Sequence, residues 1–309
     1  MSEKPDRNLG LELVRVTEAA ALTASRWVGM GQKEAGDRAA VDAMRLLLRT
    51  VRMDGTIVIG EGEKDSAPML FNGESVGNGS GPEVDVAVDP IEGTNLLAKG
   101  VHNSIAVLAV SGRGTMFKPG PAFYMDKLVV GPAAAGKVDL DAPVVDNLHA
   151  IARAKGMRME EITVVILDRE RNADKIDAVR EAGARVRLIT DGDVAPALMT
   201  ALPGTGVNAL MGIGGTPEGV ATACAMRGFG GEIQARLAPQ SDAERERVMK
   251  AGLDFERKLT TDEIVSGDDH YFAATGITEG DFLRGVRYTR SGAVTTSVVT
   301  RSRSGTWRM

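Results

Sequence analysis

The stretch 84–96 reads VDVAVDPIEGTNL, and it joins an apolar strand to a helix. Valine alternates with aspartate or alanine before Pro90, which is the period-two pattern of a strand. Proline has no N–H to donate to a sheet ladder, so we expect strand pairing to stop at Pro90. Gly93 permits a tight turn, and Thr94 is expected to cap a helix that starts at Asn95.

Two acids, Asp89 and Glu92, lie at this strand end, and polar groups follow four other apolar strands in the same way. Alone, the pair is typical of an ordinary strand-turn-helix junction, because aspartate is common in turns. The groups at the five strand ends are Glu61, Gly62, Glu63, Lys64 and Asp65; Asp89, Glu92 and Thr94; Arg169 and Arg171; Asp191, Gly192 and Asp193; and Thr216, Pro217 and Glu218. Strand ends that all carry polar groups predict a ligand crevice at the edge of an α/β sheet.

The pattern along the 309 residues predicts a mixed α/β (α+β) fold with a boundary near residue 140. The apolar periodicity predicts helices over 9–28 and 34–51, then strands over 56–60, 84–89, 104–110 and 126–131. After residue 146 the predicted strands 163–168, 186–193 and 207–215 alternate with helices 172–182, 194–201 and 217–227. Strands return over 271–277 and 292–302.

The composition excludes several classes of protein. A net charge of −5 argues against non-specific binding to nucleic acid. The single cysteine, Cys224, cannot form a disulfide framework and fits a reducing cytoplasm. The sequence has no signal-peptide pattern and no run of eighteen apolar residues, so we expect a cytoplasmic protein without a membrane partner.

Five carboxylates, with no thiolate or imidazole at ligand spacing, favour a hard divalent cation such as Mg²⁺ or Mn²⁺. They are Asp37, Glu61, Asp89, Glu92 and Glu218. Asp37 lies four residues before Val41 and extends the apolar stripe of its helix, so its carboxylate is expected to face inward and to need a partner or a metal.

Cations near these acids suggest an anionic substrate. Arg169 and Arg171 follow a strand, where they could clamp a phosphate or simply form a solvated charge cluster. Helix N-termini after Gly93 and Gly215 offer backbone amides to anions. The residues alone therefore indicate a metal-dependent enzyme that acts on a phosphorylated small molecule.

The sequence DPIEGT resembles the D-P-x-[DE]-G-T motif of the lithium-sensitive, metal-dependent sugar and inositol phosphatases. Further blocks in order are similar to the class II fructose-1,6-bisphosphatases of bacteria, nearly from end to end. These blocks are RVTEAAAL, DGTIVIGEGEKDSAPML, AVDPIEGT, FYMDKLVVGP, TDGD, GIGGTPEG and ATGIT.

The resemblance implies a five-layered α-β-α-β-α sandwich that hydrolyses the 1-phosphate of fructose 1,6-bisphosphate with Mg²⁺ or Mn²⁺. It implies a metal-binding half over 1–140 and a substrate-binding half over 141–309. Asp37 and Glu61 would hold one metal, and Asp89, Glu92 and Glu218 the other. The implied catalytic residues are Thr94, Glu61 and Asp65. The implied substrate-binding residues are Glu92, Gly93, Thr94, Tyr124, Arg169, Arg171, Asp191, Asp193 and Gly215.

Some features depart from the family pattern, and other functions stay open. Gln32 stands where the family commonly has aspartate, Arg38 follows the expected ligand Asp37, and the sequence stops at Met309, short of the usual family end. We expect Arg38 to point to solvent. The alternatives are sedoheptulose 1,7-bisphosphate, inositol monophosphate or nucleotide hydrolysis, and a sugar-phosphate sensor without catalysis. A homo-oligomer, dimer or tetramer, is also expected.

Overall fold

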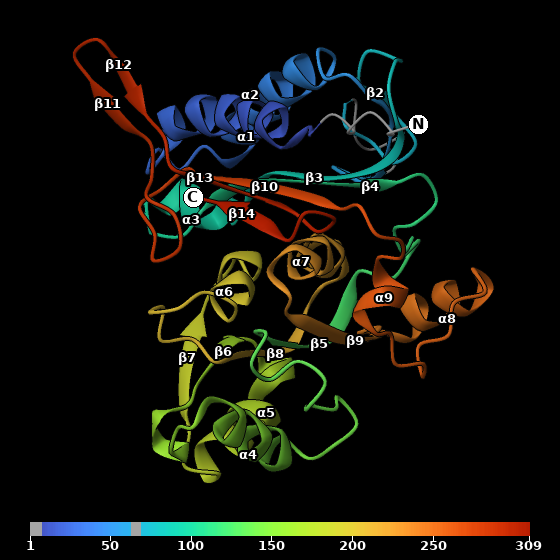
Figure 1. The fold of residues 1–309 in the computed structure, drawn as a ribbon, viewed down its shortest axis with the longest axis vertical. Helices are drawn as coiled ribbons and strands as arrows, with labels where there is room; N and C mark the ends of the chain where they lie inside the picture. The colour runs from blue at the N-terminus through green and yellow to red at the C-terminus, as the bar shows by residue number, and fades with distance from the viewer. Residues whose placement is uncertain (1–7, 63–68) are drawn as a thin grey trace, which may run out of the picture.

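The computed structural model describes residues 8–62 and 69–309, which form five alternating layers of helices and sheets (Figure 1). Helices α1 (Gly10–Ala24) and α2 (Lys33–Leu48) cover the outer face of a seven-stranded sheet. Helices α6 (Val194–Met199) and α7 (Thr216–Phe229) lie between this sheet and a five-stranded one. On its far side lie α4 (Val144–Lys155) and α5 (Ala173–Glu181). The expected α-β-α-β-α sandwich is confirmed.

The seven-stranded sheet has the order β14-β13-β10-β4-β3-β1-β2. Its strands are β1 (Asp54–Ile59), β2 (Ser75–Val76), β3 (Glu83–Glu92), β4 (Ile105–Gly112), β10 (Tyr271–Gly276), β13 (Ser297–Arg301) and β14 (Thr306–Arg308). Within it β1 and β3 are parallel, while the other neighbours are antiparallel. The carboxyl ends of β1 and β3 therefore point to the same edge of the sheet.

The five-stranded sheet has the order β7-β6-β8-β5-β9. Its strands are β5 (Tyr124–Val130), β6 (Thr163–Leu167), β7 (Arg185–Ile189), β8 (Ala209–Gly215) and β9 (Glu232–Leu237). The strands β7, β6 and β8 are parallel neighbours, so their carboxyl ends also share one edge. The sequence predicted all of these strands except β9.

Neither sheet is built from one half of the chain. Strand β5 lies before residue 140 and pairs with β8 and β9 in the five-stranded sheet. Strands β10, β13 and β14 come from the last forty residues and complete the seven-stranded sheet. The division at residue 140 stays a prediction about domains, and the two sheets do not follow it.

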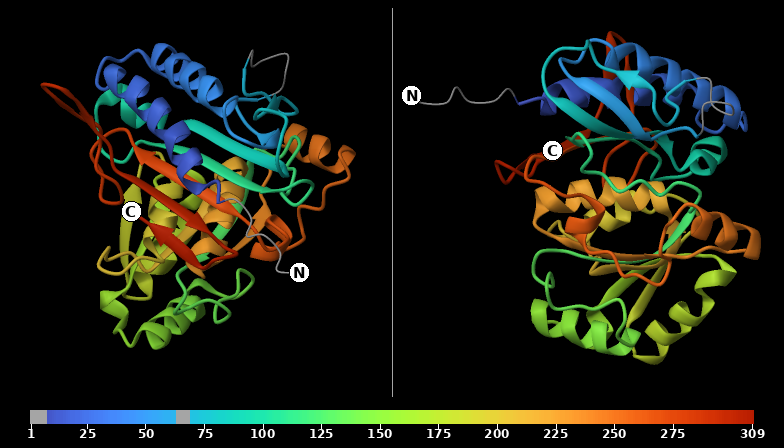
Figure 2. Two further views of the ribbon diagram at one scale, coloured as in Figure 1. Left: turned by 45° about the horizontal axis from the view of Figure 1, so that its top comes forward. Right: turned by 90° about the vertical axis from the view of Figure 1, so that its right-hand side faces the viewer.

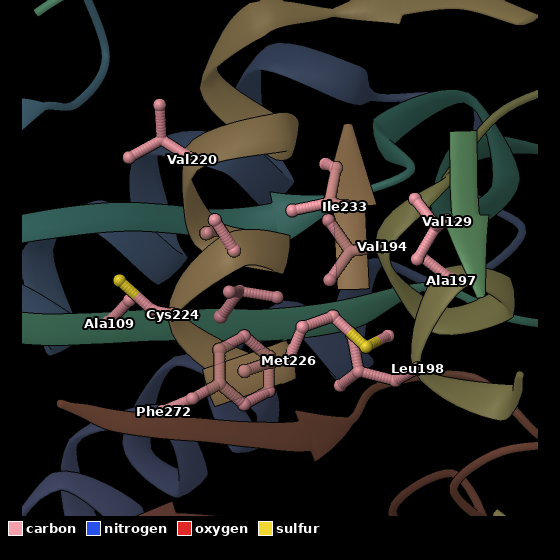
Figure 3. Packing of buried hydrophobic residues seen from close by; sticks show 14 of the residues in the cluster. Ala109, Val129, Val194, Ala197, Leu198, Val220, Cys224, Met226, Ile233 and Phe272 are labelled. Carbon is pink, nitrogen blue, oxygen red and sulfur yellow. The ribbon is translucent and has the colours of Figure 1, made fainter. Parts of the chain in front are cut away.

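The middle layer is packed on all sides because α7 is enclosed by both sheets. Eleven of its fourteen residues are buried, as in a helix that is apolar all round. In Figure 3, Val220, Cys224 and Met226 from this helix pack among Phe272 of one sheet and Ile233 of the other. Cys224 is buried and unpaired, so it fills the core as a small apolar residue.

Shorter elements complete the described chain. They are α3 (Thr94–Lys99), α8 (Asp242–Lys250), α9 (Thr261–Ile264), the 3₁₀ turns Ser25–Trp27, Met159–Glu161 and Glu170–Asn172, and the hairpin of β11 (Arg287–Thr289) and β12 (Gly292–Val294). The hairpin projects away from the body next to α1 (Figures 1 and 2). No helix in the described ranges is long and apolar enough to cross a membrane.

Two expectations about the opening stretch are wrong. Pairing does not stop at Pro90, because β3 continues to Glu92, which pairs with Ile105 after an irregularity in register beyond Asp89. Thr94 does not cap the following helix, because Gly93 takes the N-cap position with a φ of 86° and Thr94 is the first helical residue. Thr94, as the first residue of α3, lines the space in front of the helix.

Candidate active site

A cavity of about 440 Å³ lies where the strand ends of the two sheets approach each other. The ends of β1 and β3, the start of α3, the turn before α6, the start of α7 and one face of α2 form its wall. Its polar lining includes Lys33, Glu34, Asp37, Glu61, Asp89, Thr94, Asp191 and Glu218. Of the strand-end groups that the sequence predicted to meet in one crevice, six line this cavity: Glu61, Asp89, Thr94, Asp191, Pro217 and Glu218. Glu63 and Lys64 lie outside the described residues.

Local structure aims three of the carboxylates into the cavity. Asp37 is half-buried on α2, one turn before the buried Val41, as its place on the apolar stripe predicted. Arg38 is exposed, so it points to solvent as expected. Glu61 follows β1, and Asp89 lies on β3, where its Oδ1 accepts a hydrogen bond of 3.1 Å from the N–H of Ile91.

Glu92 and Asp193 lie behind the cavity lining. Glu92 is only 2% exposed, and its Oε1 accepts a hydrogen bond of 3.2 Å from the N–H of Val194, at the start of α6. Asp193 is 4% exposed and pairs with the ammonium group of Lys127, with 2.5 Å between Nζ and Oδ2. Asp191, in the same turn, lines the cavity, and its Oδ2 accepts a hydrogen bond of 3.0 Å from the side chain of Asn95.

The start of α7 brings Glu218 close to Gly215. A Cβ atom at Gly215 would lie 1.9 Å from Oε2 of Glu218, so a larger residue there would displace that carboxylate. Gly215 pairs with Tyr124 across the β5–β8 ladder. This register places Tyr124 at the same sheet edge as the acidic cavity.

The two arginines of the RER sequence lie beside this edge rather than in the cavity lining. The guanidinium of Arg171 sits 4.5 Å from the ring centroid of Tyr124, and its Nε donates to the carbonyl of Ile213 at 3.2 Å. Arg169 donates to the carbonyl of Thr190 at 2.6 Å, next to Asp191. Both arginines are therefore held on strand ends rather than free in solvent.

Asn172 is a structural residue of the site that the sequence reasoning missed. It is buried, its Oδ1 accepts from the N–H of Ile213 at 2.7 Å, and its Nδ2 donates to the carbonyl of Leu167 at 3.0 Å. It thereby ties the end of β6 to β8, directly after Arg171. The only sequence signal was an asparagine at the start of a predicted helix, which suggests a cap and not a bridge between strands.

All five predicted ligands have carboxyl pKa values above their ordinary range. Burial is the largest cause in each case. For Glu61, burial and then the charge of Asp37 raise the pKa to about 7. The charge of Glu218 adds to the raised pKa of Asp89, and those of Asp89 and Asp193 add to that of Glu92. The acids are thus close enough to repel each other.

This donor set fits a divalent cation. Oxygen donors are what Mg²⁺ and Mn²⁺ prefer, and a cation would relieve the mutual repulsion of the acids. Among the described residues, the buried Oε2 atoms of Glu92 and Glu218 have no hydrogen-bond partner. Within the same described ranges, no three acidic, imidazole or thiol groups already converge as a finished metal site. Asp65, the remaining predicted catalytic residue, lies outside the described residues.

The sandwich fold and its carboxylate cavity define a class of protein, the phosphatases that depend on a divalent metal. Within this class, the chain belongs to the family described as bacterial fructose-1,6-bisphosphatase, glpX-encoded, whose family model matches residues 7–309.

Curated relatives of the chain carry consistent names. Proteins of Synechococcus sp. strains JA-3-3Ab and JA-2-3B'a(2-13) are each 45% identical to it, and the alignments cover 98% of this chain and 94% of theirs. Both are named D-fructose 1,6-bisphosphatase class 2/sedoheptulose 1,7-bisphosphatase. A protein of Acaryochloris marina with the same name followed by the number 2 is 44% identical, and its alignment also covers 98% of this chain and 94% of that protein.

Among solved structures, an extragenic suppressor from Pyrococcus furiosus matches 61% of this chain and 68% of its own, with 16% identity and a TM-score of 0.31. A likeness of this size carries no argument about the site.

Proposed function

We propose that this chain hydrolyses the 1-phosphate of fructose 1,6-bisphosphate to give fructose 6-phosphate and inorganic phosphate, a reaction of gluconeogenesis. Family membership over nearly the whole chain supports this activity. The observation that carries it is the pairing of two different environments at one sheet edge. One is the acidic cavity, and the other is the pair Arg171 and Tyr124, a cationic and aromatic surface beside it. A bisphosphate has two phosphate groups, so it needs one place for the phosphate that reacts and another for the phosphate that does not.

The reaction would use Mg²⁺ or Mn²⁺, held at the carboxylates. Asp37 and Glu61 would bind one ion, and Asp89, Glu92 and Glu218 a second. Bound there, a divalent cation would neutralise phosphate charge and lower the pKa of a water ligand. The raised pKa values and the two unpartnered glutamate oxygens support this assignment.

The chain's own groups would orient the substrate and water. Thr94 lines the cavity at the start of α3, so its hydroxyl would position the attacking water in line with the P–O bond that breaks. The backbone at Gly93 would contact the same phosphate. We propose Asp65 as a further catalytic residue.

The rest of the substrate would lie toward the second sheet. Tyr124, Arg169 and Arg171 would hold the phosphate that does not react. Asp191, Asp193 and the backbone at Gly215 would accept the sugar hydroxyls. A seven-carbon bisphosphate is a second candidate substrate, because the curated relatives carry sedoheptulose 1,7-bisphosphatase in their names.

The motif DPIEGT also places the chain, by our proposal, in the lithium-sensitive phosphatase superfamily. We further propose that the protein acts in the cytoplasm as a homo-oligomer, without nucleic-acid or membrane partners. Its acidic balance of −5 and its single buried cysteine support this proposal.

The test is phosphate release from fructose 1,6-bisphosphate with Mg²⁺, Mn²⁺ or EDTA. Wild type should turn over only with metal, and Glu61→Gln and Thr94→Ala should each lose about 100-fold or more in kcat, because each removes a group that acts on the reacting atoms. Glu246→Gln is the matched control, since this glutamate is exposed on α8. A protein that releases phosphate from inositol or nucleotide phosphates, but not from the bisphosphate, would contradict the substrate. A melting shift with fructose 1,6-bisphosphate but no phosphate release would instead indicate a sensor.

A further inference from the structure

A lysine occupies a core position directly behind the active-site cavity. Lys127 lies on β5 between Met125 and Val129, which face the middle layer with it, and it is only 1% exposed. Helix α7 passes close above, because a Cβ at Gly219 would lie 3.4 Å from Cδ of Lys127. An ammonium group is costly in such a place unless it is paired. Its presence among apolar neighbours therefore calls for a function.

Among the described residues, Lys127 makes two polar contacts, and both belong to segments that we assign to sugar binding. Its Nζ lies 2.5 Å from Oδ2 of Asp193, in the turn before α6. It also donates to the carbonyl of Gly215, at the end of β8, over 3.1 Å. The side chains of the ion pair are 2% and 4% exposed, so water does not compete for either partner.

The neighbouring backbone leaves space for this ion pair. A Cβ at Gly214 would lie 2.1 Å from Oδ2 of Asp193 and 2.9 Å from Nζ of Lys127. Because Gly214 has no side chain, the aspartate and the ammonium can meet directly against β8. The second oxygen of Asp193, Oδ1, is buried and has no hydrogen-bond partner among the described residues.

We propose that Lys127 is a positioning residue for the sugar part of the substrate. Its ammonium fixes Asp193 and the Gly215 carbonyl relative to each other, and so sets the position of the turn in which Asp191 lines the cavity. Lys127 is not part of the cavity lining, so it acts through these two groups and does not touch the substrate. The inference rests on the proposed function, because that function assigns Asp193 and Gly215 to the sugar.

The charge of Lys127 also suits its surroundings. The charges of Asp193 and Glu218 add to the raised carboxyl pKa of Glu92, and the charge of Lys127 counteracts the raised pKa of Glu218. An apolar residue of similar length would leave Asp193 as a buried charge without a partner. Lys127 therefore supports an acidic turn that the fold would otherwise not hold in place.

Product binding tests the proposal without turnover. Fructose 6-phosphate and, separately, inorganic phosphate are titrated calorimetrically into the Mn²⁺-loaded protein. Lys127→Met should weaken fructose 6-phosphate binding by about 10-fold to 100-fold, because small misplacements of positioning groups have effects of this size. Inorganic phosphate, which has no sugar hydroxyls, should bind as it does to wild type. Equal losses for both ligands, or no loss for either, would overturn the proposal.

Two further variants keep the test decisive. Lys127→Arg keeps the positive charge but moves the hydrogen-bond donors. It should weaken fructose 6-phosphate binding with little change in melting temperature. Unchanged affinity would also overturn the proposal. Lys258→Met removes another lysine ion pair, with Asp141 at 3.0 Å on the surface, and should bind both ligands like wild type. Loss of fructose 6-phosphate binding in this control would show that the effect is general.

The two proposals fail in different ways. If wild type releases no phosphate from the bisphosphate, the proposed reaction is wrong, whatever the variants do. If wild type does so and Lys127→Met binds fructose 6-phosphate normally, only the role of Lys127 is wrong.

Discussion

Single residues of this site are defined by a conflict between charge and burial. Glu61 and Asp89 lie at the ends of apolar strands, and burial raises both carboxyl pKa values more than any neighbouring charge does. A folded protein that holds such groups without a cation is less stable when they ionise. The acids therefore carry a pH signature that can be measured on the metal-free chain.

We expect the unfolding free energy of the EDTA-treated protein to fall as the pH rises from about 4.5 to about 7. Over this range Glu61 keeps its proton in the folded chain, where its pKa is about 7, but loses it in the unfolded chain, where the ordinary value is 4.5. Proton binding then favours the folded state only at low pH. Glu61→Gln removes this contribution, so above pH 7 it should be more stable than wild type, by up to about 3 kcal/mol.

Urea unfolding at pH 5, 6, 7 and 8 measures this difference. Glu246→Gln, at an exposed position, should follow the wild-type pH dependence. If Glu61→Gln shows the same slope as wild type, burial of Glu61 does not raise its pKa in solution.

At this scale the sequence predicted the acids but not their supports. Asp37 could be placed because helical periodicity assigns it to an apolar stripe, and Thr94 because it follows a strand-end motif. Lys127 and Asn172 could not, because their roles depend on partners 66 and 41 residues away. A single sequence without a known fold gives no distance between such segments.

Elements of the second sheet hold the site through their ends. Asn172 ties β6 to β8 through the oxygen and the nitrogen of its side-chain amide. A Cβ at Gly212 would lie 2.8 Å from its Oδ1. Gly212 has a φ of 115°, a conformation that favours glycine and that leaves room for the amide. The position of Arg171 thus depends on the join between two strands.

Asn172→Ala should lower the unfolding free energy by about 2–4 kcal/mol, because it removes the acceptor of the Ile213 N–H and one of the donors to the Leu167 carbonyl. It should also raise the KM for fructose 1,6-bisphosphate about tenfold, since Arg171 loses its fixed place. Urea unfolding and steady-state kinetics test the two effects.

Asn147→Ala is the matched control. Asn147 is also buried and bridges backbone groups, accepting from the N–H of Asp139 at 2.8 Å, but it does so from α4 and is not part of the cavity lining. It should lose stability without a change in KM. Equal KM values in both variants would contradict the role of Asn172.

Most elements were predictable because their periodicity is strong, and the exceptions have local causes. Strand β9 was missed although its six residues, EIQARL, alternate polar and apolar groups as a strand does. The end of β3 was placed too early because proline usually ends pairing, yet here a shift in register lets the strand continue. Gly93 rather than Thr94 caps α3 because its positive φ completes the turn.

The whole molecule brings five acids together from the seven-stranded sheet, α2 and α7, so its stability depends on what neutralises them. Mn²⁺ that binds only the folded state raises its stability by about 2.7 kcal/mol at 100 times the dissociation constant. The acids repel each other without metal, so removing one carboxylate should stabilise the metal-free protein. The same change should reduce the stability that Mn²⁺ adds.

Glu218→Gln should therefore melt above wild type in EDTA and gain less than wild type when Mn²⁺ is added. Thermal melting with and without Mn²⁺ tests this crossover. The exposed Glu263→Gln at α9 should not cross over, because its carboxylate lies outside the cavity. If Glu218→Gln gains as much from Mn²⁺ as wild type, Glu218 is not a ligand.

The mixed α/β class could be predicted because helices alternate with strands in blocks, and the five layers followed from the family resemblance, but the route of the chain through the layers could not be read from the pattern. Strand β5 and strand β10 have ordinary strand patterns, and neither pattern says which sheet will receive it. The choice depends on tertiary contacts across more than a hundred residues, such as Phe272 with Ala109.

The place of β10 has a consequence for how the protein is made. It lies inside the seven-stranded sheet, between β4 and β13, yet it comes from residues 271–276 of 309. While the ribosome synthesises the chain, one edge of β4 stays open until nearly nine-tenths of the residues exist. An open strand edge can pair with another chain. Until β10 is made and pairs with it, this edge of β4 is therefore open to pairing with a second chain.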